Sequence, residues 1–107
     1  MRDFFPIVEL KGNPYEMGKT HGRKLAKEIK ANLKLYFMMF RGFTGLEPQQ
    51  CLGHAGRFLD VLQKDVPFIL EEIEGIADGA ELPVKEILFL NARSELMSMV
   101  QTQNAIP

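Results

Sequence analysis

The sequence predicts an α+β protein that is mostly helical, with one edge strand near residues 4–10. Apolar residues recur at helical spacing along most of the chain, and prolines stand where such stretches begin. A single stretch, FFPIVEL, combines the aromatic and β-branched residues that are typical of a strand. The 107 residues are too few for two domains, so we expect one segment, 1–107.

Composition excludes several classes of protein. The formal net charge is −1 and the charges of both signs are interspersed, which argues against a nucleic-acid partner. No apolar run approaches the roughly 18 residues of a membrane span. The start, MRDFFPIVEL, lacks the apolar core of a signal peptide. The single Cys51 excludes an internal disulfide. We therefore expect a cytoplasmic protein without a membrane or nucleic-acid partner.

The predicted strand at residues 4–10 ends before Gly12 and contains Pro6. Proline cannot donate a hydrogen bond to a neighbouring strand, so an edge position is favoured. A lone strand is not stable, because a sheet needs about three strands or a packed helix. No second convincing strand is present, and the last residues form a polar stretch after an apolar helix. These features indicate that the chain is part of something larger.

The first helix has a complete start signal. Asn13 is a good N-cap, Pro14 suits the first helical position, and Glu16 completes a capping-box pattern. Gly42 and Gly45 supply the stop. The spacing therefore predicts one long helix of roughly 40 Å. Its apolar stripe consists of Tyr15, Gly18, Gly22, Leu25, Ile29, Leu33, Tyr36 and Phe40.

Three further helices are expected along the rest of the chain. The second runs from Pro48 to Asp65, and the third begins at Pro67 with Gly79 past its end. The fourth begins at Pro83 and bends near Asn91. The tail, QTQNAIP, lacks periodicity and is expected to be irregular.

Gly18 and Gly22 lie in the middle of the apolar stripe, where each costs the helix roughly 1 kcal/mol relative to alanine. Since glycine has no Cβ, the pair predicts close packing against another backbone. A phosphate cradle is not indicated, because the glycines are inside the helix and not in the loop before it. We expect His21 to order a neighbouring loop, and a catalytic role is the less favoured alternative.

Three motifs in the same order resemble one known family. The stretch VELKGNPYEMGKTHGRKLA follows a G-x-P-[YF]-E-[MI]-G-x-x-H-G pattern, EEIEGIADGA follows E-E-I-x-G-I-A-x-G-A, and LNARSEL follows L-N-x-R-x-E. These patterns are similar to those of the acyl-coenzyme A:6-aminopenicillanic-acid acyltransferase (isopenicillin N acyltransferase) family of N-terminal-nucleophile hydrolases. The resemblance covers about residues 7–96 and is weakest in FRGFTGLEPQQCLGHAG. The matched residues are Gly12, Pro14, Tyr15, Glu16, Met17, Gly18, His21, Gly22, Glu71, Glu72, Ile73, Gly75, Ile76, Ala77, Gly79, Ala80, Leu90, Asn91, Arg93 and Glu95.

The resemblance implies a fold that this chain does not complete alone. Members of the family have a four-layer αββα sandwich and are made as an inactive precursor that cleaves itself on the amino side of a cysteine. That cysteine becomes the nucleophile and the first residue of the larger β subunit. Residues 1–107 would then be the α subunit, inactive alone, whose strand pairs with strands of the β subunit.

The resemblance also implies an acyl-transfer chemistry without a cofactor or metal. A small-molecule acyl donor, such as acyl-coenzyme A or an amide, passes its acyl group to the cysteine sulfur. An amine or water then accepts it, so transfer and hydrolysis both stay open. In the family the nucleophile follows a glycine shortly after the L-N-x-R-x-E segment, and no such Gly–Cys pair is present here. Cys51, in the poorest-matching region, is expected to be a core or surface thiol. We thus expect no catalytic residue in this chain.

Asn91, Arg93 and Glu95 interrupt the apolar pattern of the fourth helix. The favoured interpretation is a buried Arg–Glu pair, with the asparagine ending a helix, that ties this helix to the β subunit. The alternative is that Arg93 or Asn91 shapes the mouth of the active site or the strained scissile bond. A free-standing helical protein-interaction module without catalysis is the alternative function. It accounts for the missing nucleophile but not for the strand or the three motifs.

Overall fold

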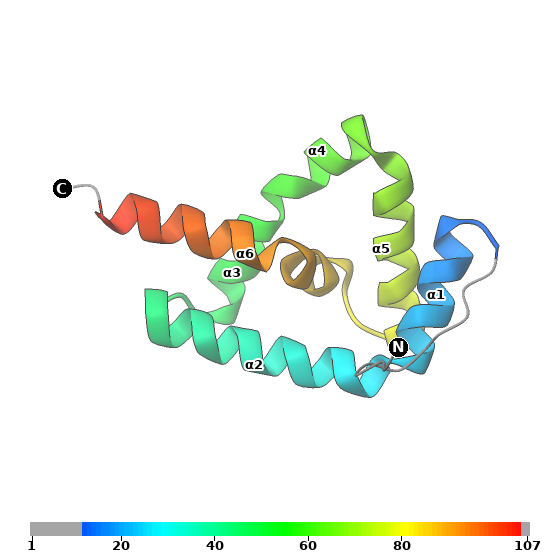
Figure 1. The fold of residues 1–107 in the computed structure, drawn as a ribbon, viewed down its shortest axis with the longest axis horizontal. Coiled ribbons are helices and arrows are strands. Elements are labelled where there is room, and N and C mark those ends of the chain that lie inside the picture. Colours follow the sequence, from blue (N-terminus) through cyan, green and yellow to red (C-terminus); the bar gives the residue numbers. More distant parts are fainter. Residues whose placement is uncertain (1–11, 106–107) are drawn as a thin grey trace, which may run out of the picture.

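A computed structural model describes residues 12–105, and within that range all regular structure is α-helical (Figure 1). The predicted strand at residues 4–10 lies outside the described residues. The mostly helical character expected for the rest of the chain is confirmed. The helices are α1 (Pro14–Lys24), α2 (Ala26–Thr44), α3 (Pro48–Ala55), α4 (Arg57–Asp65), α5 (Pro67–Ala80) and α6 (Val84–Ala105).

The predicted helix starts are confirmed. Asn13 caps α1, because its side-chain oxygen accepts a hydrogen bond from the backbone N–H of Glu16 at 2.9 Å. A proline occupies the first turn of α1, α3 and α5, where its missing N–H leaves no hydrogen bond unmade. The last helix, α6, begins directly after Pro83.

The single long first helix predicted from the stripe is wrong, because the chain bends at Leu25 and forms α1 and α2. Leu25 has φ −110° and ψ 21°, outside the helical range. Its N–H still donates to the carbonyl of His21 at 2.9 Å, and its carbonyl accepts from Ile29 at 2.8 Å. The hydrogen bonding therefore continues through the bend. The bend lets α1 pack along α5 while α2 packs beside α6.

The second predicted helix, Pro48 to Asp65, is also two helices, α3 and α4, which meet at Gly56. The third continues past Gly79, and its end is set by Glu81, which adopts the left-handed conformation with φ 59°. The predicted irregular tail is wrong as far as Ala105, because α6 runs to that residue. Figure 1 shows the first turns of α6 end-on and its later turns from the side, so this helix bends between them.

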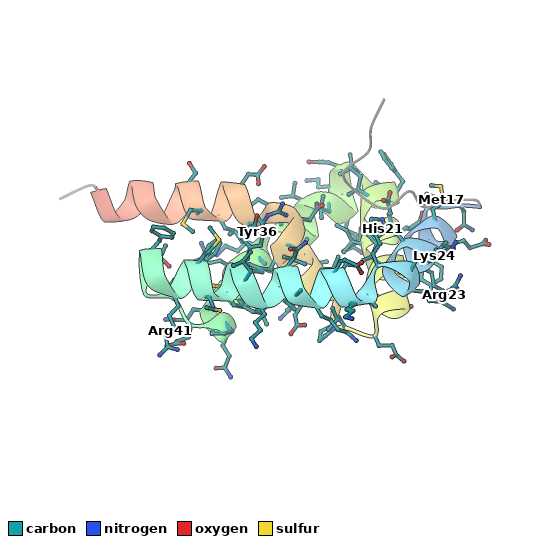
Figure 2. The ribbon with its side chains drawn as sticks, turned by 60° about the horizontal axis from the view of Figure 1, so that its bottom comes forward. Met17, His21, Arg23, Lys24, Tyr36 and Arg41 are labelled. Carbon is teal, nitrogen blue, oxygen red and sulfur yellow. The ribbon has the colours of Figure 1, made fainter. Side chains whose placement is uncertain are left out.

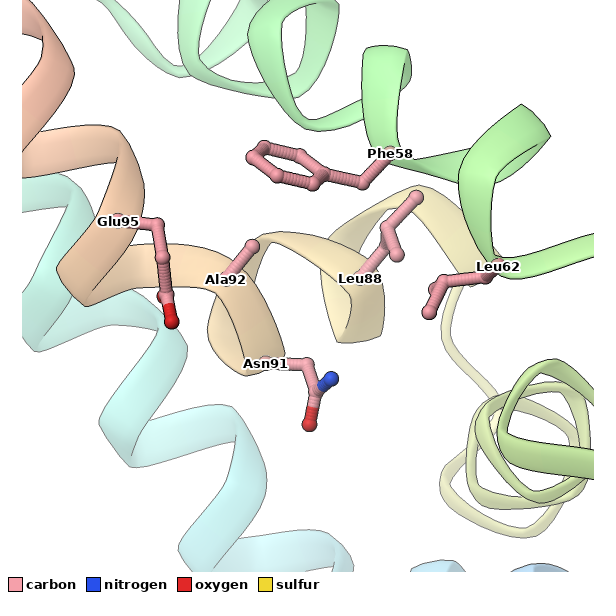
Figure 3. Close-up of a pocket in the computed structure, with 6 residues that line it drawn as sticks. All are labelled: Phe58, Leu62, Leu88, Asn91, Ala92 and Glu95. Atoms are coloured by element: carbon pink, nitrogen blue, oxygen red, sulfur yellow. The ribbon is translucent and has the colours of Figure 1, made fainter. Parts of the chain in front are cut away.

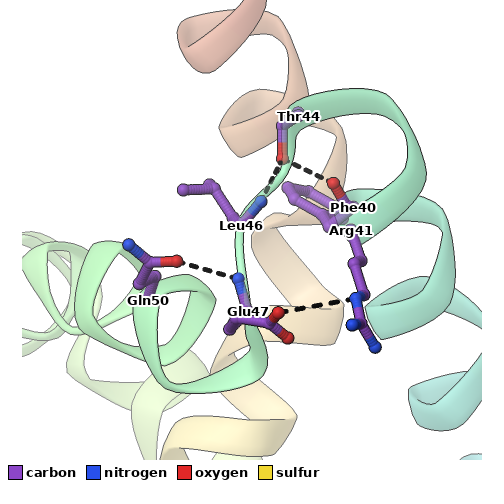
Figure 4. Close-up of polar contacts among 6 residues, drawn as sticks. All are labelled: Phe40, Arg41, Thr44, Leu46, Glu47 and Gln50. Atoms are coloured by element: carbon purple, nitrogen blue, oxygen red, sulfur yellow. Dashed lines mark hydrogen bonds and ion pairs between the residues drawn. The ribbon is translucent and has the colours of Figure 1, made fainter.

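The connection from α2 to α3 is held by local polar contacts (Figure 4). Gly45 ends α2 in the left-handed conformation with φ 77°, and the Thr44 hydroxyl donates to the carbonyl of Phe40 at 2.5 Å. Arg41 Nε lies 3.4 Å from a carboxylate oxygen of Glu47. Both of these side chains are exposed, so their ion pair contributes little to stability.

The core is centred on the first turns of α6. The Phe89 side chain is fully buried there, stacked on Phe37 with ring centroids 4.8 Å apart and edge-on to Phe40 at 5.0 Å. Such aromatic pairs add about 0.5–1.5 kcal/mol to the burial of their area. The buried cluster contains Leu33, Phe40, Cys51, Ala55, Ile73, Ala77, Ile87, Leu88, Phe89, Ala92 and Leu96. The bent α6 is thus the element around which α2, α3 and α5 pack.

Candidate functional site

Four glycines form the crossing between α1 and α5. A Cβ at Gly18 or Gly22 would lie within 3.0 Å of backbone atoms of α5, and a Cβ at Gly75 or Gly79 within 3.0 Å of backbone atoms of α1. The contacts advance in the same direction along both helices, so the two helices run parallel. This reciprocal crossing brings the backbones closer together than any side chain would allow. It fixes the position of α1 relative to the rest of the chain.

Tyr15 adds a polar contact to the same crossing. Its hydroxyl donates a hydrogen bond of 2.5 Å to a carboxylate oxygen of Asp78 on α5. This hydrogen bond raises the pKa of Tyr15 above its ordinary value, because ionisation would remove the donated proton beside a carboxylate. The contact is at the surface and ties the start of α1 to the last turns of α5.

Arg93 on α6 is held by two groups. Its guanidinium carbon lies 4.6 Å from the centroid of the Tyr36 ring on α2, and its Nη1 donates to the backbone carbonyl of Leu90. Figure 2 shows Tyr36 on the side of α2 that faces α6. Such a cation–π contact contributes about 0.5–1 kcal/mol at a partly exposed site. Arg93 therefore has a defined place and does not extend freely into solvent.

His21, Asn91 and Arg93 come together at one hollow of about 260 Å³ between α1, α2, α5 and α6, here named the four-helix hollow. Its apolar lining is formed by Ile29, Ile76, Ile87 and Leu90, and Glu72 completes its polar lining. The sequence places His21 and Asn91 seventy residues apart. The close crossing of α1 on α5 brings the histidine to α6. An apolar floor with a few convergent polar groups is the usual form of a small-molecule or segment-binding surface.

Glu95 lies at a second, smaller hollow of about 150 Å³, which Asn91 also lines (Figure 3). Phe58 and Leu62 of α4 and Leu88 and Ala92 of α6 supply its apolar lining. The amide of Asn91 and the carboxylate of Glu95 are its polar groups. Asn91 is therefore the residue that the two hollows share.

The predicted buried Arg93–Glu95 pair is wrong. The described residues show no ion pair between these two side chains, and Glu95 is exposed. The physical reason is the partner that each side chain has instead: Arg93 lies over Tyr36, while Glu95 borders the second hollow. Asn91 does not end a helix either, because α6 continues through it.

Cys51 is in the core of the molecule and not at either hollow. Its side chain is 1% exposed, within α3. Burial raises the pKa of this thiol above its ordinary value, because the thiolate would lose its hydration. A buried, protonated thiol is a poor nucleophile.

A third hollow, of about 390 Å³, carries mixed charge. Lys19, Arg23 and Lys30 line it together with Asp78 and Glu81. It lies at the carboxyl ends of α1 and α5, where helix dipoles disfavour anions. It is therefore a solvated charged surface and not a phosphate site. Among residues 12–105 no group of His, Cys, Asp and Glu is arranged to hold a metal ion, and no helix is long and apolar enough to span a membrane.

Glu72 in the four-helix hollow, and Tyr36 beneath Arg93, carried no specific functional prediction. Glu72 belongs to a matched motif but lies in a run of acidic residues, which resembles an ordinary solvated helix face. Tyr36 was assigned to the apolar stripe, with the wall of an acyl-chain pocket as the less favoured alternative, although its ring also holds Arg93. The sequence offers no signal for either role, since both depend on how α2 and α5 lie beside α6.

Comparison with known proteins confirms the resemblance found in the motifs. No protein-family model matches the chain. The acyl-coenzyme A:6-aminopenicillanic-acid acyltransferase, 40 kDa form, of Emericella nidulans is 33% identical to it over 88 residues, which are 82% of this chain and 25% of that protein. The chain therefore spans about a quarter of the length of the curated relative that it matches. The matched length is greater than that of the three motifs together, so the similarity extends beyond them.

Proposed function

We propose that this chain, which resembles the acyl-coenzyme A:6-aminopenicillanic-acid acyltransferases, is the α subunit of a self-processing cysteine N-terminal-nucleophile enzyme. The observation that carries the proposal is the 33% identity over 88 residues, with the three motifs in order. Residues 1–107 would form a single segment that completes an αββα sandwich with a β subunit from the same precursor. In this proposal the helices of residues 12–105 belong to one outer layer, and the predicted strand at residues 4–10 pairs with strands of the β subunit.

The nucleophile in this proposal is a cysteine of the larger polypeptide. Cys51 is unsuited to the role because it is buried and its pKa is raised. The thiol of an N-terminal cysteine has its own α-amine beside it, which serves as a local base once cleavage has freed it. Processing would thus create the catalyst.

The proposed reaction is acyl transfer through a thioester. The cysteine sulfur attacks the acyl carbon, the bond to the leaving group breaks, and coenzyme A thiol or an amine leaves with the proton. An amine or water then attacks the thioester, forms the new C–N or C–O bond and releases the cysteine thiol. Backbone donors stabilise the oxyanion in both steps. Transfer from acyl-coenzyme A is favoured, because the Emericella nidulans relative is named as an acyltransferase that uses this donor class.

This chain would shape the border of the active site and would not supply a reacting group. In this proposal the four-helix hollow, with His21, Asn91 and Arg93 at its polar rim, borders the site formed with the larger polypeptide. Glu95 belongs to the neighbouring hollow and is not placed with them. The defined position of Arg93 over Tyr36 suits a residue that orients a neighbouring segment.

Acyl labelling tests the proposal. The protein is expressed from its complete coding sequence, purified, mixed with hexanoyl-coenzyme A, quenched in acid and weighed by mass spectrometry. We expect one hexanoyl group on the larger polypeptide, none on this chain, and its removal by hydroxylamine. The Cys51→Ala variant is the control and should label equally. An acyl group on Cys51, or no thioester on either polypeptide with any acyl-coenzyme A or N-acyl amide donor, would contradict the proposal.

A further inference from the structure

Helix α2 has apolar residues on two faces, and only one face is covered. The inner face places Leu33 and Phe40 in the core. The outer face exposes Leu35, Met38, Met39 and Phe43, whose side chains are 49%, 63%, 36% and 69% accessible. We name these four residues, together with Gly42, the outer face of α2. Contiguous exposed apolar residues of this kind mark interaction surfaces.

The spacing on the outer face suits packing against another element. Leu35, Met39 and Phe43 are four residues apart, so they form one ridge along the helix. Met38 lies beside that ridge. Methionine side chains are flexible and adapt to an irregular partner surface. The charged residues of α2 near this region, Lys34 and Arg41, lie outside the ridge on the helical wheel.

Gly42 supplies a second observation. At the α1–α5 crossing, backbone atoms of the neighbouring helix occupy the place of the missing Cβ at all four glycines. A Cβ at Gly42, by contrast, would meet no atom within 4 Å. Glycine inside a helix costs roughly 1 kcal/mol relative to alanine. The prediction that Gly42 helps to end the helix is wrong, because α2 continues through it to Thr44 and Gly45 forms the cap. Its position beside Met38, Met39 and Phe43 leaves a gap in the apolar face, through which a partner backbone can approach closely.

The size of the related protein indicates the occupant. This chain spans 25% of the acyltransferase that it resembles, so about three quarters of that protein have no counterpart in these 107 residues. In the proposed function this remainder corresponds to the larger polypeptide, which is the body of protein that the ridge of leucine, methionine and phenylalanine would pack against. The other exposed apolar pair, Val61 and Phe68, is accessible to a similar extent, 52% and 56%, but has only two members and no glycine between them.

We propose that the outer face of α2 is the surface on which the larger polypeptide of the enzyme packs, with one of its elements lying across Gly42. This interface rests on the proposed function, since it presupposes a processed partner. The four-helix hollow then borders the site, while the outer face of α2 supplies much of the affinity between the two polypeptides.

Paired lysine substitutions test the interface. The processed assembly carries a tag on this chain, is immobilised, and the loss of the larger polypeptide is followed with time. Met38→Lys combined with Phe43→Lys should accelerate dissociation at least about tenfold, because lysine at a packed apolar anchor is desolvated without a partner. Val61→Lys combined with Phe68→Lys is the matched control and should leave dissociation within about twofold of the unsubstituted protein. Circular dichroism of each variant shows that the helices are retained.

A glycine pair gives an independent test of the close approach. Gly42→Ala and Gly53→Ala both place a methyl group where nothing lies within 4 Å, so both should raise the thermal midpoint of the 107-residue chain. Only Gly42→Ala should accelerate dissociation of the larger polypeptide. Equal dissociation rates for the two alanine variants would remove Gly42 from the interface and overturn the close approach.

The remaining outcomes separate this inference from the proposed function. One outcome is that cleavage produces a larger polypeptide with a leading cysteine, but that this polypeptide dissociates from the Met38→Lys and Phe43→Lys variant no faster than from the control. The interface is then overturned and the proposed function stands. If no larger polypeptide forms, both are overturned. A dimer of this chain, or binding to phospholipid vesicles, that the Met38→Lys and Phe43→Lys pair abolishes would assign the face to a second copy or a lipid surface and overturn the interface.

Discussion

Gly18 and Gly22 illustrate how single residues set the geometry of this molecule. Each weakens the intrinsic stability of α1, yet each lets a carbonyl of α5 occupy the space of the missing Cβ. Gly75 and Gly79 of α5 likewise make room for carbonyls of α1. Carbonyl oxygens placed this close to glycine Cα atoms also make weak C–H···O contacts, which recur at such helix crossings. The gain in packing is therefore available only while all four positions lack a side chain.

Alanine at the crossing should be strongly destabilising. Gly18→Ala or Gly75→Ala forces two backbones apart, and we expect a loss of about 2–3 kcal/mol in the free energy of unfolding. Urea denaturation followed by circular dichroism measures it. Gly53→Ala, in open space, is the matched control and should gain about 0.5–1 kcal/mol. A crossing variant as stable as the control would show that the helices are farther apart than described.

The buried Cys51 should make the free energy of unfolding decrease at alkaline pH. Its folded pKa is raised above 9.0 by burial, so the unfolded chain releases the thiol proton first as the pH rises. The stability contribution of the protonated thiol is therefore complete below the pKa of the unfolded chain and is lost as the pH rises through the raised folded pKa. Urea midpoints between pH 8 and 10.5 should fall, and Cys51→Ala should flatten the fall in its first part. Tyr15, whose pKa is raised by Asp78, adds to the upper part, so Tyr15→Phe is the companion variant. A curve unchanged by Cys51→Ala would contradict a buried thiol.

At the scale of helices, their starts could be predicted and their interruptions could not. Pro14, Pro48 and Pro67 fix φ at the first helical position, and this local effect can be read from the sequence. The break at Leu25 has no such signal. A leucine there is compatible with helix, and the bend arises because α1 must follow the glycine crossing while α2 follows α6. At Gly56 the glycine was a visible signal, but an apolar pattern that continued across it favoured one helix.

The candidate site was predictable in composition but not in arrangement. Sequence motifs singled out His21, Asn91 and Arg93, and the structure gathers these residues at one hollow. Glu95 was grouped with them because it belongs to the same L-N-x-R-x-E motif and also interrupts the apolar pattern of the helix. Residues two apart on a helix point in different directions, and the bend of α6 does not bring Arg93 and Glu95 into an ion pair. The place of Arg93 over Tyr36 depends on tertiary packing alone.

Two helices end at a residue in the left-handed conformation, and a substitution at one end should stabilise the protein while a substitution at the other should destabilise it. Glu81 ends α5 with φ 59°, a conformation that costs an L-residue with a side chain about 1 kcal/mol. Glu81→Gly should therefore raise the free energy of unfolding by about 0.5–1 kcal/mol in thermal or urea denaturation. Gly45→Ala, at φ 77° after α2, should lower it by about 1 kcal/mol. The same sign for both variants would contradict the described helix ends.

At the scale of the whole molecule, the helices form a core of their own and also leave apolar surface uncovered. Phe89 and its neighbours are buried without any partner chain, whereas Met38 and Phe43 on α2 are largely exposed. This combination suits a polypeptide that is structured but packs against a larger body. It agrees with a chain that spans a quarter of the acyltransferase it resembles.

The most direct test of the central claim is the intact mass, under denaturing conditions, of the protein expressed from its complete coding sequence, with N-terminal sequencing of every polypeptide found. We expect two polypeptides: a small one containing this chain and a larger one beginning with cysteine. A substitution of that leading cysteine by alanine should leave one uncut precursor. A single, monodisperse and well-folded species of 12.2 kDa from the unsubstituted sequence would contradict the subunit assignment and favour a helical interaction module.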